Sequence, residues 1–174
     1  MADPRSITAD AFEILVSREL RRAGIEPVNL RRRNLQTTPG TDVPMTFELH
    51  GILQAYGQRW SVLVECRNAG TAVTPNVVAD LRQRTDAAAV ASAMLFTTDF
   101  IDDAALPAAR ANAIPLLRIV DAHRAYVANG TIQAGQLPAW LPEFTVEIVS
   151  GEGARLLEAD QPETILRELR RAQP

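Results

Sequence analysis

The clearest pattern in the chain is a strict alternation of polar and apolar residues between positions 42 and 50. Period two over this length indicates a strand with one buried face. A second alternating stretch runs from Trp60 to Arg67, after a connection that we expect at Gly51 to Gly57. A link this short between two alternating stretches predicts an antiparallel hairpin.

The rest of the chain shows helical and strand patterns in turn. An amphipathic helix fits residues 8–23, and Gly24 stands where a left-handed residue ends a helix. We also expect strands at 25–30, 93–97 and 115–120 and helices at 75–86, 102–112 and 121–128. This order predicts an α/β fold with a central mixed β-sheet of about five strands flanked by helices.

The last part of the chain has a different composition. Residues 131–142 contain one glycine and two prolines, as linkers do, and are followed by a predicted strand at 144–149 and a predicted helix at 162–172. So short a segment cannot bury a core of its own. We therefore expect residues 6–128 to form one domain and residues 129–174 to pack on it as a C-terminal extension.

The hairpin predicts a meeting of charged side chains. In an antiparallel pair the start of the first strand lies beside the end of the second, which brings Asp42 next to Glu65 and Arg67. Their polar faces coincide if the apolar faces share one core. Two converging carboxylates can hold Mg²⁺, which activates water and stabilises charge on a phosphate oxygen. The alternative is structural: Asp42 caps a turn, and Glu65 and Arg67 form an ion pair without chemistry.

Charge and composition change this picture in two ways. All 18 basic residues are arginine, which excludes mechanisms that need a lysine, such as P-loop phosphate binding and Schiff-base chemistry. A net charge of −3 gives no global attraction to nucleic acid. Locally, however, Arg31, Arg32 and Arg33 follow one another and could meet DNA phosphates, with a solvated face as the alternative.

Several features bear on the compartment. The single cysteine, Cys66, cannot form an internal disulfide, and no uncharged stretch is long enough to span a bilayer. The chain does not open with a charged and then apolar leader. We expect a cytoplasmic protein that does not act at a membrane, with Cys66 as a core residue because it alternates with Val62 and Val64.

Beyond these patterns, the chain resembles the Mrr-type restriction endonucleases of the PD-(D/E)XK nuclease superfamily. The resemblance covers roughly residues 6–122 and implies a restriction-endonuclease-like core that acts on DNA. The matching residues are Phe12-Glu13, Asp42, the run Val62 to Arg67, Leu95 to Thr98 with Phe100, Ala104-Ala105, and Ile114 to Leu117.

The resemblance also implies a role for each matching residue. Asp42 corresponds to the first metal-binding aspartate and Glu65 to the second acidic ligand of Mg²⁺ or Mn²⁺. Glu13 corresponds to an acidic residue that assists the metal or water. Arg67 stands at the position of the catalytic lysine, where arginine keeps the charge but is a poor base. Because the chain has no lysine, only another arginine, such as Arg82, could take over that role.

These observations predict a Mg²⁺-dependent DNA endonuclease. Arg31, Arg32, Arg33 and Arg82 are the predicted DNA contacts. The alternative is a catalytically inactive nuclease-like domain that binds DNA or a protein partner. A homodimer is also expected, since a duplex has two strands to cut and most soluble oligomers are twofold.

Overall fold

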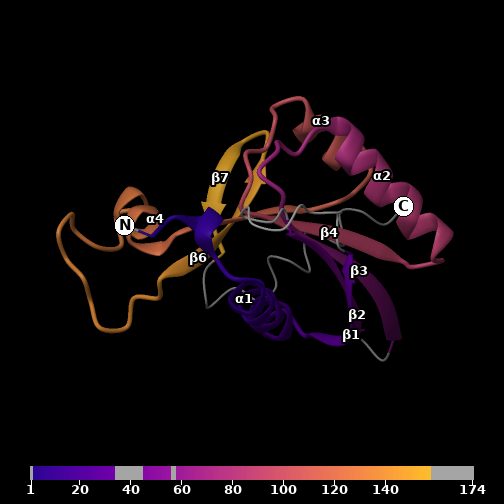
Figure 1. The fold of residues 1–174 in the computed structure, drawn as a ribbon, viewed down its shortest axis with the longest axis horizontal. Coiled ribbons are helices and arrows are strands. Elements are labelled where there is room, and N and C mark those ends of the chain that lie inside the picture. Colours follow the sequence, from indigo (N-terminus) through magenta and orange to yellow (C-terminus); the bar gives the residue numbers. More distant parts are fainter. Residues whose placement is uncertain (1, 34–44, 56–57, 158–174) are drawn as a thin grey trace, which may run out of the picture.

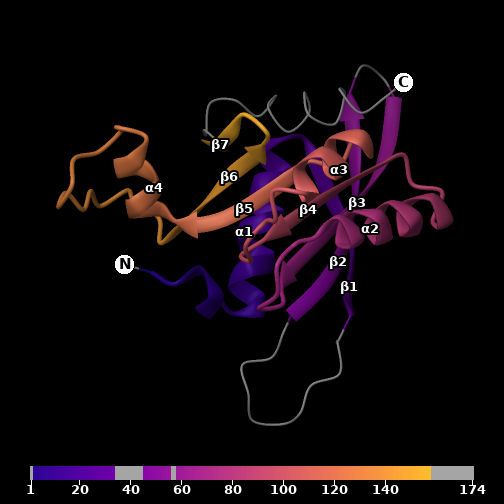
Figure 2. The ribbon, with the colours of Figure 1, turned by 90° about the horizontal axis from the view of Figure 1, so that it is seen from above.

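A mixed β-sheet forms the middle of the molecule. A computed structural model gives the structure, which describes residues 2–33, 45–55 and 58–157. Within these residues seven strands lie side by side in the order in which they follow along the chain (Figure 2). The strands are β1 (Ile25–Arg33), β2 (Met45–Ala55), β3 (Gln58–Asn68), β4 (Ser92–Thr97), β5 (Leu116–Asp121), β6 (Phe144–Ser150) and β7 (Gly153–Leu156).

The direction of the strands changes along the sheet. The pairs β1–β2 and β2–β3 are antiparallel, β3–β4 and β4–β5 are parallel, and β5–β6 and β6–β7 are antiparallel. This confirms the predicted α/β fold with a mixed sheet. The sheet has more strands than the expected five or so, because β6 and β7, from the predicted extension, join it.

Helices cover both faces of the sheet (Figure 1). They are α1 (Ala9–Arg22), α2 (Pro75–Ala87), α3 (Ala105–Ala111) and α4 (Ala122–Ala128), after a short 3-10 helix, η1 (Pro4–Ser6). Helix α1 lies on one face, and α2 and α3 lie on the other. None of the helices in the described ranges is long and apolar enough to cross a membrane.

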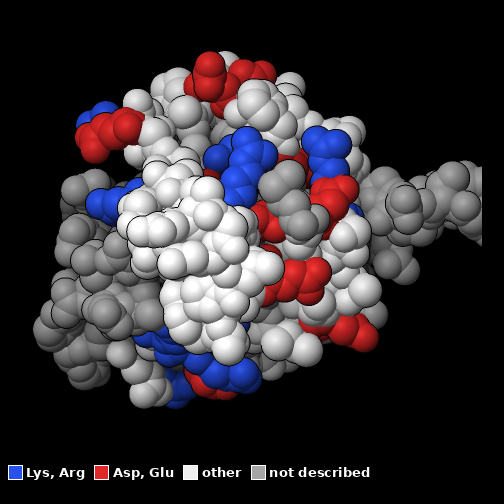
Figure 3. All heavy atoms as spheres, turned by 90° about the vertical axis from the view of Figure 1, so that its left-hand side faces the viewer, with Lys and Arg blue, Asp and Glu red and all other residues white. Residues whose placement is uncertain are grey.

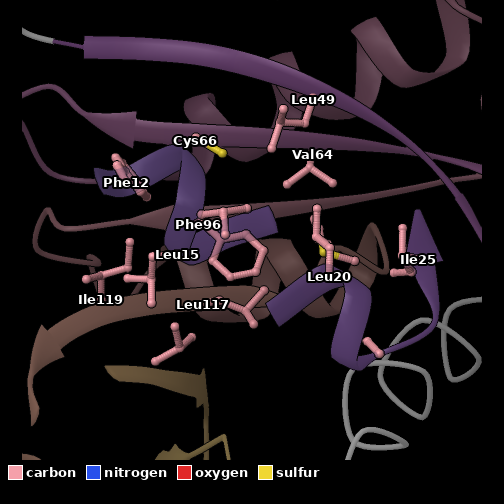
Figure 4. Close-up of a cluster of buried hydrophobic side chains, with 14 of the residues drawn as sticks. Phe12, Leu15, Leu20, Ile25, Leu49, Val64, Cys66, Phe96, Leu117 and Ile119 are labelled. Atoms are coloured by element: carbon pink, nitrogen blue, oxygen red, sulfur yellow. The ribbon is translucent and has the colours of Figure 1, made fainter. Parts of the chain in front are cut away.

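The alternation in β2 and β3 divides the core into two layers. Phe47 and Cys66 pair on the α1 side, where Phe12 stacks edge-on against Phe47 at a centroid distance of 5.4 Å. Figure 4 shows Phe12 and Cys66 in this layer, together with Phe96. Leu63, which has the opposite parity, packs on the α2 side with Leu81. Strand β3 therefore contributes to both hydrophobic layers, whereas β2 contributes apolar side chains to the α1 layer.

The helix ends follow the local sequence rules, with one difference. The Thr8 hydroxyl accepts the N–H of Ala11 at 3.2 Å, and Gly24 ends α1 with φ +78°, as predicted. Helix α3 begins at Ala105 instead of residue 102. The Asp102 side chain accepts the N–H of Ala104 at 3.0 Å, which closes a turn before the helix starts.

The predicted connection at Gly51 to Gly57 is wrong. Strand β2 continues to Ala55, and Gly51 lies inside it, opposite Val62. A Cβ at position 51 would come within 2.5 Å of Cγ2 of the buried Ile25 on β1. Glycine is needed here for close packing between strands and not for a turn. The predicted helix at 162–172 lies outside the described residues.

Candidate active site

The register of β2 and β3 fixes which polar side chains share a face. Thr46 pairs with Arg67 and Glu48 pairs with Glu65, on the face opposite α1. The antiparallel hairpin and the coincidence of its polar faces were both predicted, and both are confirmed. Asp42 lies outside the described residues, so its approach to Glu65 stays a prediction.

A guanidinium from α2 lies between the two glutamates. Arg84 donates through Nη1 to Glu48 Oε1 and through Nη2 to Glu65 Oε2. Its Nε donates to Asp80 Oδ2 at 2.9 Å, one helical turn earlier. The side chains of Glu48 and Glu65 are only 9% and 3% exposed, and that of Arg84 is 17% exposed. One partly buried cation therefore ties both strands of the hairpin to α2.

The charge of Arg84 is reinforced by these contacts. Burial by itself lowers the pKa of the Arg84 guanidinium. The hydrogen bond and charge of Glu65, and then Asp80 and Glu48, outweigh burial and raise that pKa above its ordinary value. Arg84 is thus a permanent positive charge, and the carboxylates facing it have a fixed counter-ion.

Arg67 contacts a different part of the site. Its Nη2 donates to Thr71 Oγ1 at 2.7 Å, and its Nε lies 3.7 Å from Asp99 Oδ2. The arginine that contacts Glu65 is therefore Arg84, whereas Arg67 is held by the loop after β3 and by Asp99, two residues after the end of β4.

Asp99 is a buried carboxylate that the sequence analysis missed. It is 2% exposed and accepts the N–H groups of Ala69 and Gly70, each at 2.9 Å. Its own N–H donates to Thr97 Oγ1 at 2.9 Å. The loop after β3 is thereby fixed to the end of β4. A signal was present, because three polar residues, Thr97 to Asp99, stand at the end of a buried strand that runs parallel to β3.

The two other candidates on helices belong to α1 and α2. Glu13 is half-buried on α1, on the other side of the sheet from α2. Burial, and then the charges of Glu65 and Glu13, raise the pKa of the Cys66 thiol well above its usual range.

Arg82 is 40% exposed and pairs with Asp86 through Nε at 3.2 Å and Nη2 at 2.5 Å. Among the arginines of α2, Arg84 and not Arg82 contacts Glu65.

The predicted basic run lies in β1. The backbones of Arg31, Arg32 and Arg33 pair with Glu48, Phe47 and Thr46. Their side chains lie outside the described part of the structure, so their contact with DNA stays a prediction. Figure 3 shows the side of the molecule that α4 faces, where acidic and basic groups surround an uncharged area. That side is not a continuous basic surface for a phosphate backbone.

The donor set of the site suits a divalent metal ion only in part. In the described ranges no three His, Cys, Asp or Glu side chains gather as a metal-binding group. Glu48 and Glu65 supply two facing carboxylates, the oxygen ligands that Mg²⁺ and Mn²⁺ prefer. The residues present therefore fit part of a metal site, and Asp42 is the candidate for a further ligand.

Comparison with known proteins gives a family match over most of the chain. The Mrr-type family model, described as restriction endonuclease, matches residues 4–124. The match includes the β2–β3 hairpin, α2 and β4, and thus all the site residues described above. No curated protein and no solved structure gives a match. Since the matched segment is more than half of the chain, the resemblance inferred from the sequence is confirmed: the protein belongs to the Mrr-type restriction endonuclease family.

Proposed function

We propose that the protein is a Mg²⁺- or Mn²⁺-dependent nuclease that hydrolyses phosphodiester bonds in DNA. The observation that supports this best is the hairpin register. It puts Glu65 and Arg67 on one face of β3, in the segment that matches the nuclease family, with Glu48 beside Glu65. In this proposal Asp42 and Glu65 hold the metal ion, and Glu13 assists the metal or water.

The residues of the chain have separate tasks in this reaction. When bound, the metal ion supplies charge stabilisation for a phosphate oxygen and lowers the pKa of water. Arg67 contacts the scissile phosphate, because a guanidinium presents several N–H donors to phosphate oxygens. It stays protonated and does not act as a base. Thr71 and Asp99 orient Arg67. Arg31, Arg32, Arg33 and Arg82 contact the DNA backbone.

A specific observation favours a second candidate. Arg84 forms ion pairs with the carboxylates of Glu48 and Glu65, the groups that would bind a metal ion. The chain also has no lysine to serve as a base. Both features fit a catalytically inactive member of the family that binds DNA or a protein through the same scaffold.

Plasmid nicking in Mg²⁺ or Mn²⁺ separates the two candidates. The nuclease proposal expects cleavage by the wild type and its loss in Asp42→Ala and Glu65→Gln. Asp103→Asn is the control, because Asp103 is exposed and stands before α3. Equal cleavage by all four proteins indicates a contaminating nuclease and contradicts the proposal. Absence of cleavage together with salt-dependent DNA binding supports the second candidate.

The assembly and setting belong to the same proposal. A homodimer suits a duplex with two strands to cut, and sedimentation with and without a short DNA duplex measures it. A monomer that cuts both strands would contradict the dimer. The cytoplasm is the proposed compartment, since the buried Cys66 is a free thiol.

A further inference from the structure

The contact between Arg84 and the two glutamates has a consequence for metal binding. Arg84 Nη1 and Nη2 each take one carboxylate oxygen, from Glu48 and from Glu65. Both carboxylates are buried, and Glu65 is the proposed metal ligand. A divalent cation on these oxygens would lie a few ångströms from a guanidinium that stays protonated. Two cations at such a distance in a partly buried site repel each other.

Arg84 also has a second partner away from the hairpin. Asp80, which holds Arg84 Nε at 2.9 Å, is on the same helix and its side chain is 63% exposed. A guanidinium released from the glutamates can therefore remain paired with Asp80 at the surface. The glutamates, in contrast, lie on strands of the sheet and keep their positions. Arg84 is thus the movable member of the cluster.

We propose that Arg84 and a divalent metal ion compete for the carboxylates of Glu48 and Glu65, so that Arg84 sets the metal affinity of the site. Without metal, Arg84 neutralises the two glutamates and ties the hairpin to α2. With metal, the guanidinium gives up at least its bond to Glu65. This inference rests on the proposed function for the place of the metal, but it concerns binding and not cleavage.

Mn²⁺ binding to the full chain, followed by the electron paramagnetic resonance signal of free Mn²⁺, tests the competition. Arg84→Gln removes the charge and should bind Mn²⁺ about tenfold more tightly or better than the wild type. Arg110→Gln is the control, because it removes the same charge from an exposed position on α3, the neighbouring helix on that face of the sheet. Its Mn²⁺ affinity should equal that of the wild type. Equal or weaker binding by Arg84→Gln overturns the proposal.

Thermal unfolding gives a second readout that includes the stability of the variant. In EDTA, Arg84→Gln leaves two buried carboxylates facing each other and should melt below the wild type. Saturating Mn²⁺ should raise the melting temperature of Arg84→Gln by more than that of the wild type, because metal binds only the folded site. If Arg84→Gln does not fold, Arg84→Lys replaces it. One ammonium cannot serve both glutamates as the fork does. Unchanged Mn²⁺ affinity in Arg84→Lys then overturns the proposal.

Glu65→Gln, made in the wild type and in Arg84→Gln, separates this inference from the proposed function. Loss of Mn²⁺ binding in both backgrounds places the metal at Glu65. If the wild type binds at Glu65 and Arg84→Gln binds no better, the competition fails and the metal site stands. If Glu65→Gln changes nothing, the metal lies elsewhere and both proposals fail. Tighter Glu65-dependent binding without DNA cleavage supports the competition and contradicts the nuclease.

Discussion

Thr46 and Arg67 face each other across β2 and β3, and each has a buried polar atom without a hydrogen-bond partner among the described residues. The atoms are Thr46 Oγ1 and Arg67 Nε. A buried polar group left unpaired costs about 1–3 kcal/mol. The nearest charge to Arg67 Nε that the structure gives is the Asp99 carboxylate, whose Oδ2 is 3.7 Å away, beyond hydrogen-bond distance. The Arg67 guanidinium is therefore held by its neighbours, but its Nε–H lacks a hydrogen-bond acceptor among the described residues.

Arg67→Lys tests whether the site has adapted to arginine. Lysine has no Nε and no planar fork, so it cannot contact Thr71 and approach Asp99 as Arg67 does. We expect the variant to cleave DNA about tenfold more slowly than the wild type in Mg²⁺, because a bidentate phosphate contact is lost. The initial rate of plasmid nicking measures this. A faster rate would mean that Arg67 is a drifted catalytic lysine.

Asp99→Asn tests the hydrogen bonds by which the Asp99 carboxylate fixes the loop after β3 to the end of β4. The amide has one acceptor oxygen where the carboxylate accepts two backbone N–H groups, so one of them faces another donor. We expect the free energy of unfolding to fall by about 2–4 kcal/mol. Urea denaturation of Asp99→Asn and of the exposed control Asp103→Asn gives the comparison. The control should change by less than about 0.5 kcal/mol. Equal midpoints for the two variants would contradict this role of the Asp99 carboxylate.

Gly51→Ala tests the close approach of β1 and β2. The added Cβ meets Cγ2 of Ile25, a β-branched side chain that cannot rotate away, so we expect a loss of about 1–3 kcal/mol. Gly151→Ala is the control, because a Cβ there meets nothing within 4 Å. In an Ile25→Ala background, Gly51→Ala should lower the free energy of unfolding by less than it does in the wild type. An equal loss in both backgrounds would show that the added Cβ does not clash with Ile25.

Cys66 predicts a pH dependence of stability. Its raised pKa keeps the thiol neutral in the folded state, whereas the thiol of the unfolded chain ionises near pH 8.5. The free energy of unfolding is therefore unaffected by this group below about pH 8 and falls by up to about 1.4 kcal/mol per pH unit above pH 8.5. Urea denaturation of the wild type and Cys66→Ala between pH 7 and 10 measures it. The gap between the two proteins should change above pH 8.5, and a constant gap would contradict the prediction.

The sequence predicts best what depends on local periodicity. The hairpin and its polar face follow from alternation, which is a property of neighbouring residues. The prediction of a connection at Gly51 was wrong because a glycine can mark either a turn or a close approach between two strands. Only the packing of Ile25 against position 51 distinguishes the two.

The sequence does not predict which arginine contacts Glu65. The buried stripe of α2 includes Val78 and Leu81, and Arg82 and Arg84 flank that stripe. Side chains two residues apart on a helix point in directions that differ by about 200°. Arg82 and Arg84 therefore lie on opposite sides of the buried stripe. Which side meets the hairpin depends on how the whole helix docks on the sheet. Asp99 depends in the same way on the pairing of β3 with β4, which lie far apart in the chain.

Strand β6 has a consequence for how two copies of the chain can associate. It pairs with β5 along the whole length of β5, from Leu116 with Val149 to Asp121 with Phe144. The family match ends at residue 124, so β5 is the last strand of the matched segment. With β6 in place, the backbone N–H and C=O groups on that side of β5 are already bonded. Two protomers therefore cannot fuse their sheets there, and a twofold assembly has to use another surface.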